Sequence, residues 1–335
     1  MAGLMGTGAR QRASAVLPPH QFHCLLDELP LHLIPAGYLN RARSWGDFSQ
    51  PVSLNPNCEV LSAKQVPAQL QARRDLIEGF NLAGTVAWVH DDATGVVNPF
   101  WLGKRLEAAV SQLSPGEPAP GSLSENDRLL LTISGILVPH GHAERHAAEW
   151  AEIVKARRQT FRENNYVPLS GLIHPFHVGA LRRYYRHAIR QGAIRLGDEQ
   201  SAFRYAVHNE SVARFFHHQL ADEVSAIVGE PVKPSYVYFA AYLSGAELKK
   251  HTDREQCEFS VTLCLDFSPE PELATSWPLR VSTPHGTVTI YQALGDGLVY
   301  RGTRVPHYRD VLAAGHTSTS VFFHYVPENF RGSLH

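Results

Sequence analysis

The chain has 335 residues, of which 44% are hydrophobic and 19% are charged, and its formal net charge is −1. That length can bury a full core and favours about two domains, and the composition excludes a wholly disordered chain. The near-zero charge argues against a dedicated nucleic-acid-binding protein, which usually carries a basic excess. No apolar run approaches the ~20 residues of a membrane-spanning helix, and no signal-peptide core opens the chain. We therefore expect a cytoplasmic protein with no membrane or nucleic-acid partner.

Cysteine and histidine give opposite indications about metal binding. The four cysteines form no Cys-x-x-Cys pair, so neither a zinc knuckle nor a disulfide framework is indicated: Cys24, Cys58, Cys257 and Cys264. The 19 histidines are an unusual count. Because imidazole is the commonest transition-metal ligand, this count justifies a search for metal-binding geometry.

The first 155 residues predict two units. Residues 1–40, rich in Gly, Ala and Pro, predict a flexible N-terminal arm. Residues 41–155 predict a smaller, mainly helical module, with helices over 65–82, 99–113 and 124–133 and strands over 84–90 and 135–138. Helix, loop, helix and short strand are the outline of a winged-helix-like unit. A charged helix over 144–163 then connects this module to the rest of the chain.

Residues 156–335 predict a second domain, in which short strands follow two amphipathic helices at 175–191 and 210–228. Turn residues separate strands at 166–169, 236–243, 258–267, 279–282, 287–291, 297–301 and 317–326. Several short strands with regular turns predict a sandwich or barrel. The expected fold is therefore α+β, a jelly roll buttressed by helices and preceded by the mainly helical module.

A His-x-Asp motif is the sharpest chemical signal. His251 and Asp253 are two residues apart at the end of a predicted strand and turn, so their side chains point the same way in an extended segment. A second imidazole would complete a facial triad, which leaves three open positions on an octahedral Fe(II) ion. His307 fits, because an apolar strand containing Gly295-Asp-Gly297 leads into it.

These motifs resemble the Fe(II)- and 2-oxoglutarate-dependent oxygenases, and most of all their prolyl-4-hydroxylase-like branch. Tyr242-x-x-Gly245, His251-Thr-Asp253, Gly295-Asp-Gly-Leu-Val-Tyr300 and His307 carry the resemblance, which covers about residues 158–327. It implies a double-stranded β-helix, Fe(II), 2-oxoglutarate and O₂ as co-substrate. It also implies that His251, Asp253 and His307 are the iron ligands and that Tyr242 binds 2-oxoglutarate.

One position departs from the family pattern. The pattern expects Lys or Arg about ten residues after the distal histidine, where this chain has Thr317. A buried carboxylate needs a cation or several strong donors. Arg309 shares a face with His307 if the strand continues, so we assign the distal carboxylate of 2-oxoglutarate to Arg309, assisted by Tyr242 and Thr317. Arg301 and His316 are the alternatives.

The resemblance implies that an unactivated C–H of a peptide, protein or amino-acid-like substrate is hydroxylated, with release of succinate and CO₂. Tyr238, on the tyrosine face of its strand, and Arg254, beside the ligands, are candidate substrate-binding residues. Two other readings stay open. One is a non-catalytic jelly-roll protein that binds or senses a ligand, and the other is a cupin-type metal enzyme that does not use 2-oxoglutarate. The sequence does not predict an oligomeric state.

The remaining histidines favour structural roles. His217 and His218 are adjacent on a predicted helix, so their side chains diverge by about 100°. His140 and His142 have only Glu144 as a nearby carboxylate and no thiolate. We therefore expect packing or solvent contacts at these positions, as at His174 and His177 beside a helix start.

Overall fold

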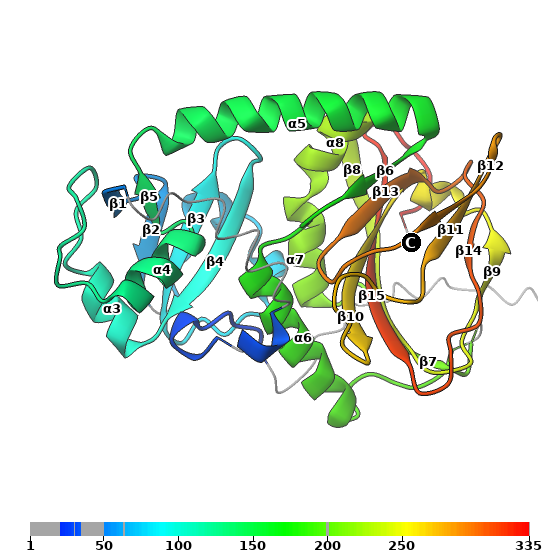
Figure 1. The fold of residues 1–335 in the computed structure, drawn as a ribbon, viewed down its shortest axis with the longest axis horizontal. Helices are drawn as coiled ribbons and strands as arrows, with labels where there is room; N and C mark the ends of the chain where they lie inside the picture. Colours follow the sequence, from blue (N-terminus) through cyan, green and yellow to red (C-terminus); the bar gives the residue numbers. More distant parts are fainter. Residues whose placement is uncertain (1–20, 30, 35–49, 63, 199–200, 335) are drawn as a thin grey trace, which may run out of the picture.

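The computed structural model describes residues 21–29, 31–34, 50–62, 64–198 and 201–334. Of the predicted arm, residues 1–20, 30 and 35–40 lie outside these ranges, and so do residues 41–49 of the predicted module. Figure 1 shows two groups of strands near the two ends of the long helix α5 (His142–Asn164). Within the described ranges, we find no helix with the length and apolarity that crossing a membrane would require.

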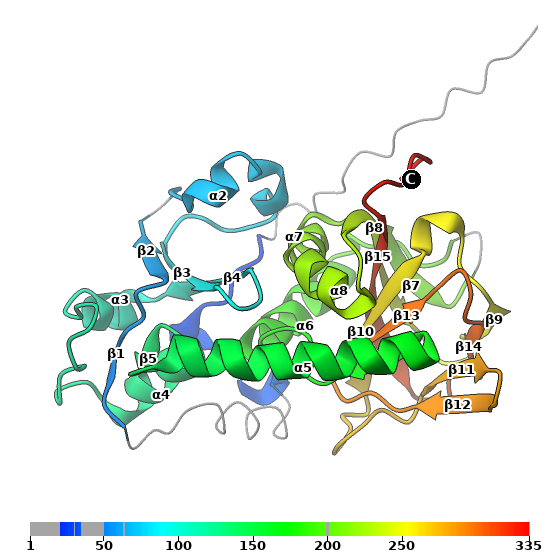
Figure 2. The ribbon, with the colours of Figure 1, turned by 90° about the horizontal axis from the view of Figure 1, so that it is seen from above.

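Two antiparallel sheets face each other at the C-terminal side of the molecule (Figures 1 and 2). One has six strands in the order β6 (Tyr166–Leu169), β13 (Gly297–Arg301), β10 (Phe259–Ser268), β15 (Thr317–Pro327), β8 (Val232–Tyr242), β7 (Arg204–His208). The other has four in the order β12 (Gly286–Ile290), β11 (Leu279–Thr283), β14 (His307–Arg309), β9 (Leu248–His251). All but β7, β9 and β14 correspond to strands that the sequence predicts.

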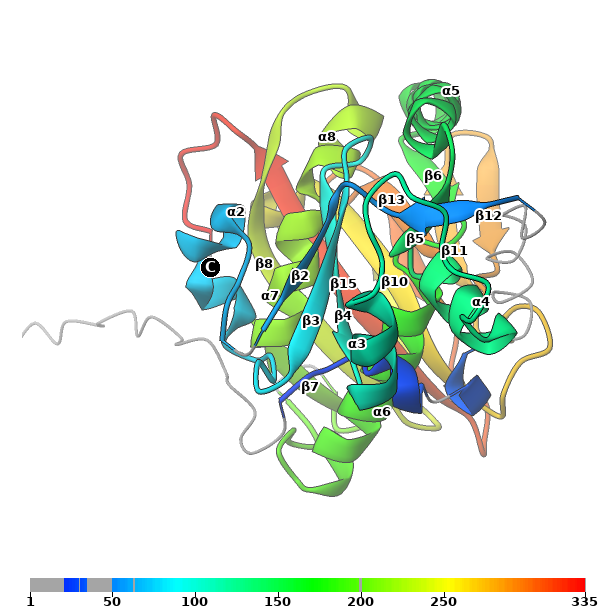
Figure 3. The ribbon, with the colours of Figure 1, turned by 90° about the vertical axis from the view of Figure 1, so that its left-hand side faces the viewer.

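Three helices cover the outer face of the six-stranded sheet: α6 (Pro175–Arg190), α7 (Ser211–Gln219) and α8 (Ala221–Val228) (Figure 3). Helix α6 begins with Pro175 at its first position, and the Nδ1 of His174 accepts a hydrogen bond from the amide of Phe176 at 3.1 Å, which caps the helix. Tyr185 of α6 stacks on Phe239 of β8 with ring centroids 4.1 Å apart. The single helix expected over 210–228 is divided at Leu220.

The N-terminal region differs from the mainly helical module that the sequence predicts. Its described part holds a three-stranded sheet, β2 (Cys58–Leu61), β3 (Thr85–Asp91), β4 (Val96–Leu102), and the strand pair β1 (Val52–Leu54) and β5 (Leu137–Pro139). The α-helices are short: α2 (Ala68–Gln71), α3 (Lys104–Val110) and α4 (Glu125–Ile133). The winged-helix outline is therefore replaced by small sheets with short helices between their strands.

Two local features explain this difference. Pro99 opens a helix in the sequence-based prediction, but it lies in β4 opposite Trp88, and β4 is an edge strand. Proline is tolerated on an edge strand, where its missing N–H costs no ladder bond. The helix expected over 65–82 is broken because Arg73, at φ −125° and ψ 40°, leaves the helical region between α2 and the 3₁₀ helix Arg74–Ile77.

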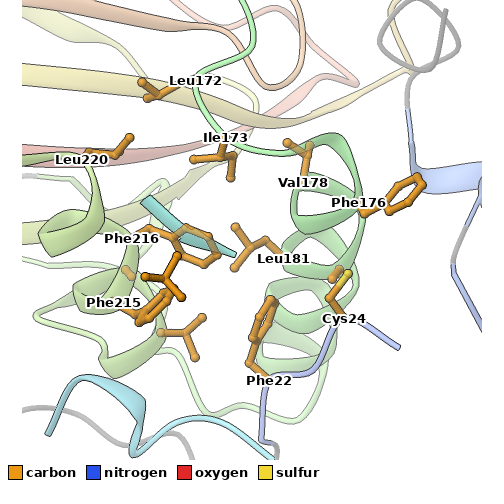
Figure 4. Close-up of a cluster of buried hydrophobic side chains, with 14 of the residues drawn as sticks. Phe22, Cys24, Leu172, Ile173, Phe176, Val178, Leu181, Phe215, Phe216 and Leu220 are labelled. Carbon is orange, nitrogen blue, oxygen red and sulfur yellow. The ribbon is translucent and has the colours of Figure 1, made fainter. Parts of the chain in front are cut away.

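One hydrophobic core joins the N-terminal region to the strand-rich half. Phe22 and Cys24, within the arm expected to be flexible, are buried beside α6 and α7 (Figure 4). The same cluster includes Trp88 of β3 and Tyr325 of β15. Helix α5 runs unbroken through residue 156, where the sequence places the domain boundary. Two further 3₁₀ turns, Leu26–Glu28 and Leu31–Leu33, follow the buried part of the arm.

Candidate metal centre

Two histidines and an aspartate, from two segments far apart in the sequence, meet between the two facing sheets. His251 is the last residue of β9 and His307 is the first residue of β14. The antiparallel register pairs these two residues directly, and such pairs have Cβ atoms about 5 Å apart. Asp253 follows β9, and its backbone amide donates to the carbonyl of Gly302 at 2.8 Å. Strand pairing thus brings together side chains that are far apart in the sequence.

The three side chains converge on one point. The Nε2 atoms of His251 and His307 lie 3.5 Å and 3.6 Å from Oδ1 of Asp253. One potential ligand atom from each residue lies within 4.8 Å of the other two. The set of two imidazole nitrogens and one carboxylate oxygen therefore fits the facial triad of a non-haem Fe(II) site.

Backbone carbonyls fix the orientation of both imidazoles. Nδ1 of His251 lies 2.7 Å from the carbonyl oxygen of Lys249, and Nδ1 of His307 lies 3.0 Å from that of Val305. A carbonyl oxygen only accepts, so each Nδ1 carries the proton and donates it. Nε2 is thereby the ring nitrogen that faces Asp253, and it is the atom that would coordinate a metal once it carries no proton.

The aspartate is ionised at neutral pH. Burial raises the pKa of Asp253, but the hydrogen bond from His251 and the neighbouring His307 outweigh it and bring the pKa to about 2. Burial lowers the pKa of His307, whereas the hydrogen bond to Asp253 raises the pKa of His251. A cation bound here would meet a negative carboxylate.

Glycine is required beside this carboxylate. A Cβ atom built on Gly302 would lie 2.4 Å from Oδ2 of Asp253 and 2.4 Å from the carbonyl oxygen of Cys257. Any side chain at residue 302 would therefore displace the aspartate or the turn that carries Cys257.

Arg309 is a buried cation two residues beyond His307. Its side chain is only 5% exposed. Nη1 donates to the carbonyl oxygen of Trp277, and Nη2 donates to Oε1 of Gln292 at 3.2 Å. Among the residues that the structure describes, no carboxylate forms an ion pair with it. Because a buried charge without a partner is costly, this guanidinium fits a bound anion.

The other candidates for the co-substrate carboxylate are placed differently. Thr317 is exposed at the start of β15, while its neighbour Ser318 is buried opposite Tyr242. Since side chains alternate along a strand, Thr317 points away from Tyr242 and is not brought to Arg309. Arg301 is bound to Glu258 at 2.6 Å. His316 lies beside Phe267, and its Nδ1 is 3.1 Å from the carbonyl oxygen of Ala314.

Tyr242 lies close to Arg309. It is buried, and its ring centroid is 5.2 Å from that of Trp277, which also contacts Arg309. The buried Arg204 offers Tyr242 a hydrogen bond, but Arg204 already binds both carboxylate oxygens of Asp198, at 2.8 Å and 3.0 Å. Arg309 therefore differs from this second buried arginine in lacking a carboxylate partner among the described side chains.

The two candidate substrate residues hold polar contacts of their own. The hydroxyl of Tyr238 donates to Oδ2 of Asp198 at 2.8 Å. The exposed Arg254 donates from Nη2 to the hydroxyl of Tyr236 at 3.1 Å. Tyr238 shares the inward face of β8 with Tyr242, and Arg254 is next to Asp253 in the chain.

Sequence reasoning assigned no role to several side chains around the site. Ser260 donates to Oδ2 of Asp253 at 2.8 Å, and His324 lies behind Ser260. Gln292 and Trp277 hold Arg309. His324 lies in the run Phe323-His-Tyr-Val326 of β15, and only the strand pairing shows what this histidine contacts.

A cavity of about 1410 Å³ lies elsewhere, between the N-terminal sheets and α5. His142, His146 and Asp91 line it, but none of the triad residues does. The volume of this cavity would favour a binding site. However, His251, Asp253 and His307 converge between the two facing sheets, so the candidate metal site lies there and not in the cavity.

Comparison with known proteins gives structural matches only. The sequence matches no protein-family model and no curated protein. A Pseudomonas putida prolyl-4-hydroxylase is 17% identical, with a TM-score of 0.43 and coverage of 53% of this chain and 100% of that chain. The epimerase SnoN from nogalamycin biosynthesis, in complex with Fe³⁺, alpha-ketoglutarate and nogalamycin RO, is 13% identical, with a TM-score of 0.43 and coverage of 53% and 84%.

A third similar structure is HygX from Streptomyces hygroscopicus, with nickel, 2-oxoglutarate and hygromycin B bound. It is 11% identical, with a TM-score of 0.42 and coverage of 52% of this chain and 88% of that chain. Two of these three structures hold a metal ion together with the keto acid alpha-ketoglutarate, which is 2-oxoglutarate.

Proposed function

We propose that the protein is an Fe(II)- and 2-oxoglutarate-dependent oxygenase whose two facing sheets form a double-stranded β-helix. The observation that carries the proposal is the convergence of two Nε2 atoms and one carboxylate oxygen within 4.8 Å. The buried Arg309, without a carboxylate partner among the described residues, supports a keto acid as the second component.

Each residue has a defined task in this proposal. His251, Asp253 and His307 hold the metal, and Arg309 binds the distal carboxylate of 2-oxoglutarate with help from Tyr242. We leave Thr317 out of this set, because it is exposed at the start of β15. When bound, Fe(II), 2-oxoglutarate and O₂ supply an oxidation of substrate C–H coupled to release of succinate and CO₂.

The substrate we favour is a peptide, protein or amino-acid-like molecule, which is hydroxylated. Arg254 and Tyr238 would contact it, Arg254 because it is exposed directly beside Asp253 and Tyr238 because it lies on the inward face of β8. The N-terminal region, predicted as residues 41–155, would contribute to substrate selection, because it shares a hydrophobic core with the helices that cover the sheet.

Anaerobic titration tests the function without knowledge of the substrate. We expect one Fe(II) per chain, and we expect 2-oxoglutarate to produce a metal-to-ligand charge-transfer absorption in the visible range. Admission of O₂ should then form succinate slowly. His307→Ala should abolish the absorption, whereas His316→Ala, which changes a partly buried histidine outside the triad, should retain it.

The other readings predict different results. Metal binding with no effect of 2-oxoglutarate would favour a cupin-type enzyme and contradict the proposal. No metal binding at all would favour the non-catalytic jelly-roll protein and would also contradict it.

A further inference from the structure

His324 lies in β15 opposite a β-bulge in β8, where Ser235 and Tyr236 stand against this one residue. This residue pairs with Ser260 of β10, but the register between β15 and β8 shifts between Phe323 and Tyr325 and leaves His324 without a partner in β8. The carbonyl oxygen of His324 instead accepts hydrogen bonds from Nε2 of His217 and Oγ of Ser235, both at 2.8 Å. Bulges commonly re-aim a side chain next to an active site.

The ring of His324 points toward the carboxylate of Asp253. Oγ of Ser260 lies 2.8 Å from Oδ2 of Asp253 and 2.9 Å from Nδ1 of His324. A carboxylate only accepts, and a hydroxyl has one proton to donate. The proton of Ser260 therefore goes to Asp253, and Nδ1 of His324 must donate to Ser260. The two hydrogen bonds form a directed chain from the imidazole to the carboxylate.

This chain engages only one of the two carboxylate oxygens. Oδ2 of Asp253 accepts from Ser260, while Oδ1 faces the Nε2 atoms of His251 and His307. An octahedral ion bound by Oδ1 and two imidazoles has three of its six coordination positions left open for other ligands. A carboxylate that rotated to coordinate through both oxygens would take one of those positions.

We propose that Ser260 and His324 are positioning residues that keep Asp253 coordinated through one oxygen and so preserve the positions that 2-oxoglutarate and O₂ need. The inference rests on the proposed function, because it concerns the same metal. His217 extends the support, since it binds the carbonyl of His324 from α7 on the outer face of the sheet.

A competing interpretation is a second metal site. Asp253, Cys257 and His324 also place one potential ligand atom each within 4.8 Å of one another. However, the hydroxyl of Ser260 bridges the carboxylate and the imidazole, and Sγ of Cys257 lies 3.1 Å from the hydroxyl of Tyr236. Protein groups therefore already satisfy this set, and we expect one ion per chain.

The test compares metal and 2-oxoglutarate affinity in variants of the full chain, with Fe(II) or Co(II) under anaerobic conditions. Ser260→Ala and His324→Phe should weaken metal binding by about 10- to 100-fold, the usual effect of removing an outer hydrogen-bond partner. At saturating metal they should also weaken 2-oxoglutarate binding, measured by the charge-transfer absorption.

Two further variants keep the result interpretable. His324→Asn places an amide N–H where Nδ1 stands, so it should restore both affinities, whereas loss through misfolding would not be rescued this way. Ser282→Ala removes a hydroxyl of β11 with no hydrogen-bond partner among the described groups, and it should bind metal and 2-oxoglutarate like the wild type.

Unchanged affinities in Ser260→Ala and His324→Phe would overturn the inference and leave the proposed function standing. Two ions per chain, reduced to one by Cys257→Ser, would overturn it in favour of the second metal site. A wild-type chain that binds no metal would overturn both the inference and the proposed function.

Discussion

The triad between the facing sheets and the group of His142, His146 and Asp91 at the N-terminal cavity use the same residue types in different geometries. In the triad, both Nε2 atoms lie within 3.6 Å of one carboxylate oxygen. In the second group, the two rings stack with an interplanar angle of 3° and centroids 5.6 Å apart. Only His146 reaches Asp91, at 2.9 Å.

The difference follows from the backbone that carries the histidines. His142 and His146 are one turn apart on α5, where residues four apart lie one above the other and their rings stack. His251 and His307 lie on adjacent strands, and the backbone carbonyl two residues before each histidine holds its Nδ1 atom. A shared composition of two histidines and an aspartate therefore does not define a metal site, whereas controlled orientation of the nitrogens does.

The largest expected effect separates the two groups directly. His307→Ala removes one of three proposed ligands and should weaken Fe(II) or Co(II) binding by more than about 100-fold, beyond the effect of an outer partner. His146→Ala should leave the affinity within about twofold of the wild type. Calorimetric or spectroscopic titration measures both. A comparable loss of metal affinity in His307→Ala and His146→Ala would contradict the assignment of the metal site to the triad alone.

The next effect concerns the co-substrate. Arg309→Met keeps the length of the side chain but removes the buried charge, and it should weaken 2-oxoglutarate binding about 100-fold, because losing a buried charged partner costs about 2–5 kcal/mol. Metal affinity should be retained. The measurement is the dependence of the charge-transfer absorption on 2-oxoglutarate concentration.

Arg280→Met is the matched control for Arg309→Met. Arg280 lies on β11 and binds Asp310 at 2.6 Å in a partly exposed ion pair. Its loss should change 2-oxoglutarate affinity by less than about twofold, since exposed ion pairs contribute little. If both substitutions weakened 2-oxoglutarate binding equally, the affinity would depend on the overall positive charge of the protein and not on a contact with Arg309.

The smallest effect is a pH-dependent contribution of His146 to stability. Its hydrogen bond to Asp91 raises the pKa of His146 above the unfolded value of about 6.5. The stabilisation is therefore fully present below about pH 6.5 and is lost as pH rises through the raised pKa. His146→Ala should lower the free energy of unfolding by less than about 1 kcal/mol near pH 5.5, and by less still near pH 9.

His142 provides a control with the opposite sign. Burial lowers the pKa of His142, so the fold favours its neutral form. Its contribution to stability therefore becomes less favourable as pH decreases. His142→Ala should therefore become more stable relative to the wild type as pH falls from about 8 to 5. Denaturant unfolding at several pH values measures both trends, and identical trends in the two variants would contradict the assigned geometry.

The strand-rich half was the more predictable part of the molecule. Turn residues and alternation located all strands of the six-stranded sheet except β7, and two of the four strands of the other sheet. The spacing of His251 and Asp253, with a late strand before His307, indicated the triad. Thr317 was expected to assist Arg309, but it is exposed at the start of β15. Its neighbour Ser318 pairs with Tyr242 and takes the buried position, and only the strand register shows which of the two points inward.

The N-terminal half was less predictable because its local signals are ambiguous. Pro99 suits a helix start and an edge strand equally, and only pairing with β3 decides between them. His324 could not be assigned a role for a related reason. Its orientation depends on a register shift between β15 and β8, and no residue type in the sequence encodes that shift on its own.

The burial of Phe22 beside Phe216, and of Cys24 beside α6 (Figure 4), has a consequence for experiments on parts of this protein. A fragment starting at residue 156 would bisect α5 and strip the aromatic layer from the helices that support the six-stranded sheet. The strand-rich half therefore depends on the preceding residues as part of its own scaffold, and substitutions within the intact chain are the sound way to separate their contributions.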